Sequence, residues 1–205
     1  MRGLILAAGL ALTSLPVWAE NHALLIGANR YQNLEERWWL KGPANDVALV
    51  AGYLTTSAPV PFDAANVTIL TDGDAGHTAP TLAAIRSAFA DLTAQVQPGD
   101  FVYLHFSGHG TQAPALDPAS ELDGLDELFL PVDIGPWSDG VGAVENALVD
   151  DEIGTLIDGL RANGANVWAV FDSCHSGTAT RSLDGTADVR TRQLPPQVWD
   201  RSRRG

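Results

Sequence analysis

Short apolar runs alternate along the chain with longer segments of helical periodicity. Four of these runs are rich in Val, Ile, Leu and aromatic residues, and each is followed by turn-forming or polar residues. They span residues 22–28 (HALLIGA), 66–71 (NVTILT), 101–107 (FVYLHFS) and 166–172 (NVWAVFD). Their nearly continuous apolar character predicts strands of a parallel sheet that is buried on both faces.

Apolar residues at three- and four-residue spacing predict helices between these strands. The helical segments span residues 43–54, 81–96 and 150–161. Pro43 suits the first turn of the first helix, and Thr78 or Thr81 can cap the second. Strands that alternate with helices predict an α/β fold with right-handed crossovers.

The chain has 205 residues, which is enough for one domain with a core. We expect a segment for export at residues 1–19, a catalytic domain at residues 20–180 and an arginine-rich tail or linker at residues 181–205. Residues 110–147 are rich in Asp, Gly and Pro, and we interpret them as a long functional loop.

The first 19 residues have the pattern of a secretory signal. Arg2 supplies a positive charge, residues 3–15 are apolar but too short to span a bilayer, and Val17-Trp18-Ala19 fits a cleavage site after Ala19. The alternative is a buried N-terminal helix. No other stretch is long and apolar enough to be transmembrane. We therefore expect an exported protein, periplasmic or secreted, without stable membrane insertion.

The formal net charge of −13 narrows the classes of binding partner that the chain can have. Such an acidic chain is repelled by phosphate backbones, which argues against nucleic acid as a partner. Basic ligands, cationic peptides and divalent cations fit better, and the alternative is that the acidity only maintains solubility. The sequence leaves the oligomeric state open.

Two predicted strands end in residues with nucleophilic chemistry. Residues 101–107 lead into Gly108-His109-Gly110, and residues 166–172 lead into Ser173-Cys174. Because active sites of parallel sheets form at the carboxyl ends of the strands, His109 and Cys174 are expected on adjacent loops. An imidazole can remove the proton of a thiol whose ordinary pKa is about 8.5 and then protonate the leaving amine.

Cys174 is the only cysteine, so it cannot form an internal disulfide, and a buried inert thiol is the alternative to a nucleophile. The backbone N–H groups of Gly110 and Cys174 can stabilise an oxyanion, at about 3 kcal/mol per donor.

A metal hydrolase is disfavoured. His105 and His109 stand four residues apart on a strand-to-loop segment, and no set of zinc ligands surrounds them.

Seven segments occur in the order found in the caspase-like superfamily. They are HALLIGAN from His22, LKGPANDV from Leu40, PGD from Pro98, FSGHG from Phe106, DELFLPVD from Asp126, VDDEI from Val149 and FDSCHSG from Phe171. The chain resembles the metacaspases in particular, of a bacterial type, over residues 22–178. Animal caspases carry Q-A-C-x-G at the cysteine, whereas D-S-C-H-S-G is the metacaspase form.

This resemblance implies a three-layer α/β/α sandwich with a mainly parallel central sheet. It implies hydrolysis of peptide bonds after Arg or Lys by a Cys-His dyad, so the expected partners are peptide or protein substrates with these residues. The positions that match the acids of the specificity pocket are Asp46 and Asp172, and Ser107 matches a serine that lines it. Two converging carboxylates would also bind a guanidinium group on physical grounds. The alternatives are a helix-first-turn acid for Asp46 and a strand-end cap for Asp172.

No cofactor is required for this chemistry, but many metacaspases are activated by calcium. The matching acids are Asp126, Asp150 and Asp151, and carboxylate oxygens suit this cation. A further acid of the family falls at Arg181, which opposes calcium binding, although Asp184 is nearby. The alternative is that Asp150 and Asp151 only begin a helix.

Relatives continue after the cysteine with two further strands, and here 31 residues follow Cys174. We expect the C-terminal strands to be missing, because the chain is a fragment or because the remainder comes from elsewhere. The arginines of the tail suit a basic-specific peptidase, and we hypothesise a self-cleavage linker. A catalytically weak, partner-binding domain and a legumain-like or gingipain-like peptidase are the alternatives.

Overall fold

The computed structural model describes residues 18–73, 76–115, 117, 124–135, 137–138 and 143–173. The helices are α1 (Pro43–Thr56), α2 (Leu82–Gln95) and α3 (Asp150–Ala162), with two 3-10 turns at Glu36–Trp38 and Ala64–Asn66. The strands are β1 (Asn21–Gly27), β2 (Val67–Thr71), β3 (Phe101–Ser107), β4 (Gly110–Pro114), β5 (Leu125–Phe129), β6 (Trp137–Ser138), β7 (Ala143–Val144), β8 (Leu148–Val149) and β9 (Asn166–Asp172). None of the helices in these ranges is long and apolar enough to cross a membrane.

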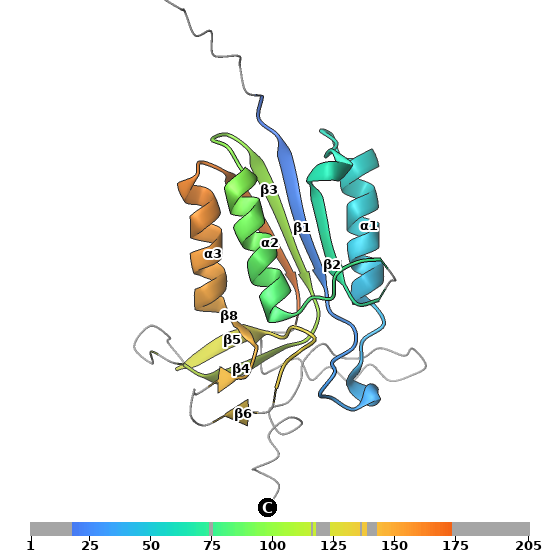
Figure 1. Cartoon of the computed structure of the whole chain (residues 1–205), viewed down its shortest axis with the longest axis vertical. Helices are drawn as coiled ribbons and strands as arrows, with labels where there is room; N and C mark the ends of the chain where they lie inside the picture. Colours follow the sequence, from blue (N-terminus) through green and yellow to red (C-terminus); the bar gives the residue numbers. More distant parts are fainter. Residues whose placement is uncertain are drawn as a thin grey trace, which may run out of the picture.

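A four-stranded parallel sheet lies at the centre of the domain (Figure 1). Its strand order is β2-β1-β3-β9, and each neighbouring pair is parallel. Parallel neighbours need crossover connections, which α1, α2 and α3 provide. The α/β fold with a mainly parallel central sheet, expected from the sequence, is confirmed.

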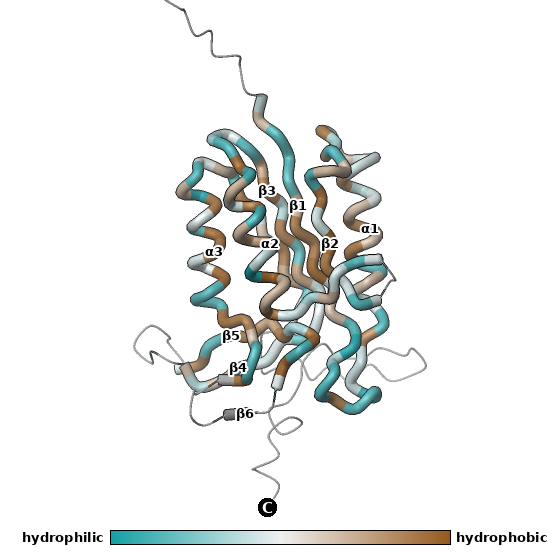
Figure 2. Tube along the Cα trace, in the orientation of Figure 1, coloured by the Kyte–Doolittle hydropathy of each residue, from teal (hydrophilic) through white to brown (hydrophobic). Residues whose placement is uncertain are grey.

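Helices cover both faces of this sheet. Successive side chains of a strand point in opposite directions, so each face presents its own apolar side chains to a helix layer. Leu24 and Ile26 of β1 belong to the larger core, together with buried residues of α2 and α3. Ala23 and Leu25, which alternate with them, belong to a smaller core with buried residues of α1. The domain is therefore a three-layer α/β/α sandwich, and Figure 2 shows its apolar strands between the amphipathic helices.

The predicted element boundaries agree closely with the observed ones. Strands β3 and β9 have the expected bounds, while α1 and α3 extend two residues and one residue further. Thr81 caps α2 as expected, since its hydroxyl oxygen accepts a hydrogen bond from the N–H of Ala84 at 3.1 Å. Pro43 occupies the first turn of α1.

The expectation of a long loop over residues 110–147 is wrong for much of this segment. Strands β4 and β5 form an antiparallel pair, and β8 extends it to a small three-stranded sheet. Asp126 and Leu128 of β5 are both buried, so their alternation with partly exposed neighbours is that of a strand. The acids of this run conceal the alternation in the sequence, because buried strand positions are normally apolar.

The prediction of four strands buried on both faces is wrong for β9. Among the described strands it lies at an edge of the central sheet, and none of its residues is fully buried. Trp168 is 62% exposed and Phe171 is 38% exposed. The apolar character of β9 therefore exceeds what the described residues cover.

A buried acid joins the amino ends of three strands. Asp100 Oδ2 lies 3.3 Å from His22 Nε2 of β1, and both side chains are buried. The N–H groups of Glu20 and Gln97 donate to Asp100 at 2.8 and 2.7 Å. Burial alone would raise the pKa of Asp100, but these two donors and His22 outweigh it and lower the pKa. The backbone oxygen of Asp100 also accepts from the N–H of Asn166, the first residue of β9, at 2.8 Å.

Candidate active site

The register of the sheet brings together the two strand ends from which the sequence-predicted loops start. Ser107, the last residue of β3, pairs with Asp172, the last residue of β9. His109 follows Ser107 by two positions, and Cys174 follows Asp172 by two positions. The N–H of Gly108 lies 3.4 Å from the oxygen of Asp172, so the loop that carries His109 contacts the end of β9 directly.

His109 is held from two sides and is 1% exposed. Its Nε2 lies 2.7 Å from the backbone oxygen of Trp38. A carbonyl oxygen only accepts hydrogen bonds, so Nε2 carries the hydrogen, and in the neutral ring Nδ1 holds the lone pair. The backbone N–H of His109 donates to the hydroxyl oxygen of Tyr31 at 2.8 Å. The two rings also contact each other, with centroids 5.0 Å apart.

Close packing explains the glycine before His109. A Cβ at Gly108 would lie 3.1 Å from Phe129, 3.1 Å from the hydroxyl oxygen of Tyr31 and 3.2 Å from Ala28. Any larger residue would push the His109 backbone away from these groups. The glycine therefore fixes the position of the imidazole.

The loop after β1 contains the residues that sequence reasoning missed. Neither Tyr31 nor Trp38 was assigned a role from the sequence, yet both contact His109. Asn29 holds this loop, because its side chain donates to the oxygen of Leu40 and accepts from the N–H of Ala44. Their position in the chain could have indicated a role, because the loop follows β1, whose carboxyl end lies at the same edge of the sheet.

The three predicted specificity residues gather at this edge. The hydroxyl of Ser107 donates to Asp46 Oδ2 at 2.9 Å, and Ser107 is the register partner of Asp172. Gly27 makes this approach possible, because a Cβ there would lie 2.8 Å from the backbone oxygen of Pro43. The first turn of α1 can thus lie on the sheet and bring Asp46 to Ser107. Asp172 is exposed and Asp46 is half-buried, so both carboxylates border solvent.

Cys174 lies outside the described residues, as do residues 1–17, Arg181, Asp184 and the rest of the tail. The structure therefore gives the end of the strand that leads to the predicted nucleophile. Gly110, the other predicted oxyanion donor, is buried and begins β4, where it pairs with Phe129.

The acids predicted to bind calcium approach one another where β5 meets α3. Asp126 is buried on β5, while Asp150 and Asp151 begin α3. The side-chain oxygen Oδ1 of Asp150 is buried without a hydrogen-bond partner. Burial, followed by the charges of Glu127, Asp126 and Asp151, raises the pKa of Asp150. A cation would relieve this repulsion, although the described residues contain no group of three or more ligands at metal-binding distances.

The described residues thus supply one part of a nucleophilic site, a buried histidine of defined tautomer beside the end of a parallel strand. A family model described as "Metacaspase, peptidase C14 domain" matches residues 21–182. The chain belongs to this family of cysteine-type peptidases.

Individual relatives agree with this assignment. The chain is 36% identical over 158 residues to Metacaspase-1A of Aspergillus oryzae, covering 77% of this chain and 34% of the relative. It is 35% identical over 155 residues to Metacaspase-4 of Arabidopsis thaliana, covering 76% of this chain and 33% of the relative. The crystal structure of a Geobacter sulfurreducens protein superposes with a TM-score of 0.56 at 28% identity, covering 89% of this chain and 60% of that one. The chain thus spans about a third of the length of these two curated relatives.

Proposed function

We propose that this chain is the catalytic domain of a cysteine endopeptidase that hydrolyses peptide bonds after Arg or Lys. Cys174 is the nucleophile and His109 is its general base. The observation that carries the proposal is the hydrogen bond between His109 Nε2 and the backbone oxygen of Trp38, which leaves Nδ1 as the proton acceptor.

The reaction proceeds in two acyl-transfer steps. His109 takes the proton of the Cys174 thiol, and the thiolate sulfur attacks the scissile carbonyl carbon. The backbone N–H groups of Gly110 and Cys174 stabilise the oxyanion that develops. His109 then protonates the leaving amine as the C–N bond breaks. Water, deprotonated by His109, releases the acyl group as a carboxylic acid and regenerates the thiol.

Asp46 and Asp172 supply the preference for a basic residue before the scissile bond. Both border solvent at the edge of the sheet that carries His109, and Ser107 connects them through its hydrogen bond and its register pair. Two carboxylates on one pocket match the delocalised charge and the five donors of a guanidinium group.

A small set of fluorogenic peptides tests this proposal directly. The peptides carry Arg, Lys, Asp or Asn before the scissile bond, and the Cys174→Ala and His109→Ala proteins serve as inactive controls. Cleavage after Arg and Lys that both controls lose is the expected result. Cleavage after Asp or Asn would keep the dyad but refute the pocket. No cleavage in any arm would favour the partner-binding alternative.

The pocket acids have a matched control on the same chain. Asp46→Asn and Asp172→Asn should each lower kcat/KM for the Arg peptide about tenfold or more, because a charge-assisted contact is worth about 1.5–3 kcal/mol. Asp158→Asn removes an exposed acid of α3 and should leave kcat/KM unchanged. Equal effects of all three substitutions would indicate a general charge effect instead of a pocket.

Calcium activation through Asp126, Asp150 and Asp151 is a further part of the proposal. The partnerless Oδ1 of Asp150 and its crowding by carboxylates support it. Calcium should raise the unfolding midpoint of the wild-type protein, and Asp150→Asn should abolish this shift. Asp158→Asn is again the control. An equal calcium shift in the Asp150→Asn protein would contradict the assignment.

We also propose that the protein is exported and that it cleaves its own arginine-rich tail. A mass spectrum of the exported protein should begin at Glu20 and show cuts after arginines of residues 181–205. The Cys174→Ala protein should keep the tail intact. Identical tail masses in the two proteins would refute self-cleavage.

A further inference from the structure

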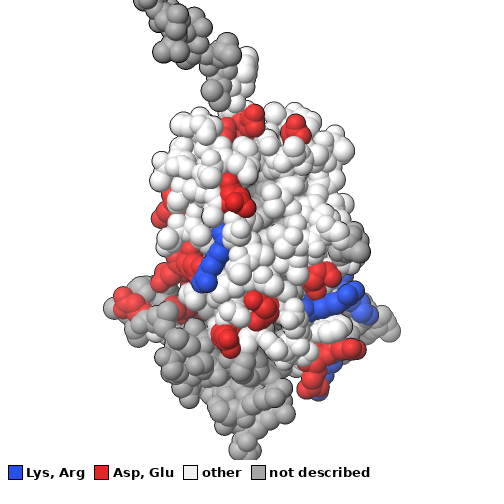
Figure 3. Space-filling view, viewed as in Figure 1, with Lys and Arg blue, Asp and Glu red and all other residues white. Residues whose placement is uncertain are grey.

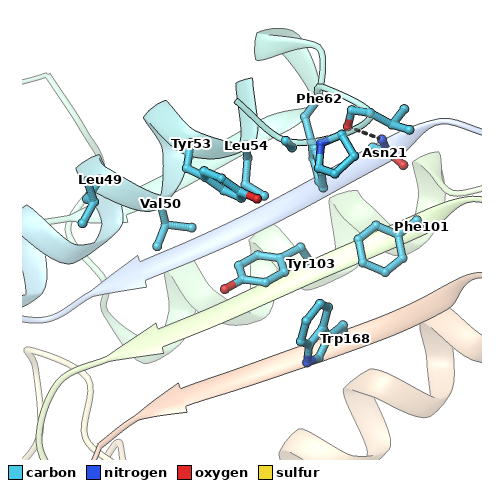
Figure 4. Close-up of a pocket in the computed structure, with 12 residues that line it drawn as sticks. Asn21, Leu49, Val50, Tyr53, Leu54, Phe62, Phe101, Tyr103 and Trp168 are labelled. Carbon is cyan, nitrogen blue, oxygen red and sulfur yellow. Dashed lines mark hydrogen bonds between the residues drawn. The ribbon is translucent and has the colours of Figure 1, made fainter. Parts of the chain in front are cut away.

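An apolar groove lies on the α1 face of the sheet, and five of its twelve lining residues are aromatic (Figure 4). It has a volume of about 750 Å³. Tyr53 projects from α1 on one side, while Phe101, Tyr103 and Trp168 rise from β3 and β9 on the other. Phe62 closes the end near the start of β1, where Asn21 donates to the backbone oxygen of Val60.

The described residues leave this groove open to solvent. Tyr53 is 53% exposed, Val60 is 68% exposed, and Trp168 projects from the edge strand. A contiguous apolar surface of this kind on a soluble protein marks a site of interaction. Each large aromatic side chain that an occupant covers removes on the order of 100 Å² from water.

The tail contains a segment whose chemistry fits this groove. Residues 194–199 read Leu-Pro-Pro-Gln-Val-Trp, and they are flanked by polar and arginine-rich stretches. Consecutive prolines favour an extended polyproline conformation, and aromatic-lined grooves bind such segments at low entropic cost. Leu194, Val198 and Trp199 add apolar side chains on either side of the proline pair.

Chain length allows this segment to reach the groove. Twenty residues lie between Ser173, which follows β9, and Leu194, and this connection can span about 70 Å when extended. A seven-residue strand is only about 23 Å long, so the chain can return along the face of β9 that carries Trp168.

Charge favours the same occupant. Six of the twelve Lys and Arg residues of the chain follow Asp172, but only three of the 25 acids do. Figure 3 shows that acidic side chains outnumber basic ones on the face of the described domain that it presents. The tail is therefore basic and the body acidic, which draws the tail toward the domain.

We propose that residues 194–199 dock in the aromatic groove between α1 and the β3–β9 edge of the same chain. The tether raises the local concentration of the segment to the order of 1 mM, so even a weak contact is occupied. A second copy of the chain and a free peptide are the competing occupants. The proposal does not depend on the proposed peptidase activity.

Disulfide trapping in the Cys174→Ala protein tests the docking. This background has no native thiol and cannot process its own tail. Tyr53→Cys combined with Val198→Cys should form an intramolecular disulfide under a mild thiol oxidant at least about tenfold faster than Thr155→Cys combined with Val198→Cys. Thr155 is exposed on α3, over the opposite face of the sheet. Equal trapping rates would overturn the proposal, and disulfide-linked dimers from the Tyr53 pair would assign the groove to a second copy.

Hydrogen exchange gives an independent readout without engineered thiols. In the Cys174→Ala chain, the double substitution Leu194→Asp and Trp199→Asp should speed amide exchange in α1 and β9 severalfold. The control is Gln193→Asp with Gln197→Asp, which adds the same charge but removes no apolar side chain. No change from the first variant, or equal changes from both, would refute docking by this segment.

Discussion

Strands β3 and β9 are neighbours in register, and each ends two residues before a proposed catalytic residue, yet their surroundings differ sharply. Five of the seven residues of β3 are buried, whereas none of those of β9 is. β3 lies between two strands and packs against α1 on one face and against Phe89 of α2 on the other, while β9 is an edge strand among the described elements.

Because of this difference, the two residues of the proposed dyad follow strands that are packed to different degrees. The side of the general base is rigid, because Tyr31, Trp38 and the packing around Gly108 fix the imidazole. The strand that leads to Cys174 receives little support on the α1 face from the described residues. Packing among the described residues therefore determines the position of His109, while the strand that leads to the proposed nucleophile is held mainly by its pairing with β3.

The largest expected contrast comes from two stacked phenylalanines, one on each strand. Phe106 of β3 is fully buried, and its ring lies 4.7 Å from that of Phe171 on β9, which is 38% exposed. Phe106→Ala should lower the free energy of unfolding by about 3–5 kcal/mol through lost burial and a cavity. Phe171→Ala should cost about 1 kcal/mol, because less area leaves water on folding. Denaturant unfolding measures both, and equal losses would show that β9 is as well packed as β3.

The next largest effect is expected at the amino ends of these strands. Asp100→Ala removes the acceptor for the N–H groups of Glu20 and Gln97 and the partner of His22. Leaving buried donors unpaired should cost about 2 kcal/mol in denaturant unfolding. Asp91→Ala, at an exposed site of α2, is the control and should cost less than about 0.5 kcal/mol.

The same residue makes stability depend on pH. The folded-state pKa of Asp100 lies below its ordinary value, so the unfolded chain binds the proton more readily. The stabilisation is present above the unfolded pKa, near 4, and is lost as the pH falls through the lower folded pKa. Unfolding free energies measured from pH 6 down to pH 3 should therefore fall less steeply in the Asp100→Asn protein. Parallel pH profiles would contradict this role.

A smaller effect is expected for the hydroxyl that positions the base. Tyr31→Phe removes the acceptor for the N–H of His109 but keeps the ring contact. We expect a loss of about 1 kcal/mol in stability and a fall of kcat up to about tenfold, with little change in KM. A change confined to KM would mean that Tyr31 contacts substrate and does not position His109. Tyr53→Phe, on the α1 helix, is the matched control.

The sequence predicted the parts of the fold that depend on continuous apolar runs. The bounds of β3 and β9 and the cap at Thr81 were correct because burial and capping have local signatures. It failed for β5, where the buried Asp126 breaks the apolar pattern, and for the exposure of β9. Whether an apolar strand is central or at an edge depends on its neighbours, which periodicity does not encode.

The candidate site likewise contains residues that the sequence predicted and residues that it did not. His109, Ser107, Asp46 and Asp172 were found from motifs, and the structure brings them to one edge of the sheet. Tyr31 and Trp38 were missed because one acts through its hydroxyl on a backbone N–H and the other through its own backbone oxygen. A contact made by a main-chain carbonyl leaves no trace in the identity of the residue, so no motif could have found Trp38.

The smallest expected effect concerns the ion pair that joins α2, which packs on β1, to α3, which contacts β9. Arg86 of α2 donates two hydrogen bonds to Glu152 of α3, at 2.6 and 2.9 Å, but both side chains are partly exposed. Arg86→Ala should cost only about 0.5–1 kcal/mol, and the cost should shrink at 1 M salt, because water and ions screen exposed pairs. Arg161→Ala, which breaks a single longer contact within α3, should cost less still. A loss above about 2 kcal/mol that resists salt would mean that this pair, and not apolar packing, holds α3 beside β9.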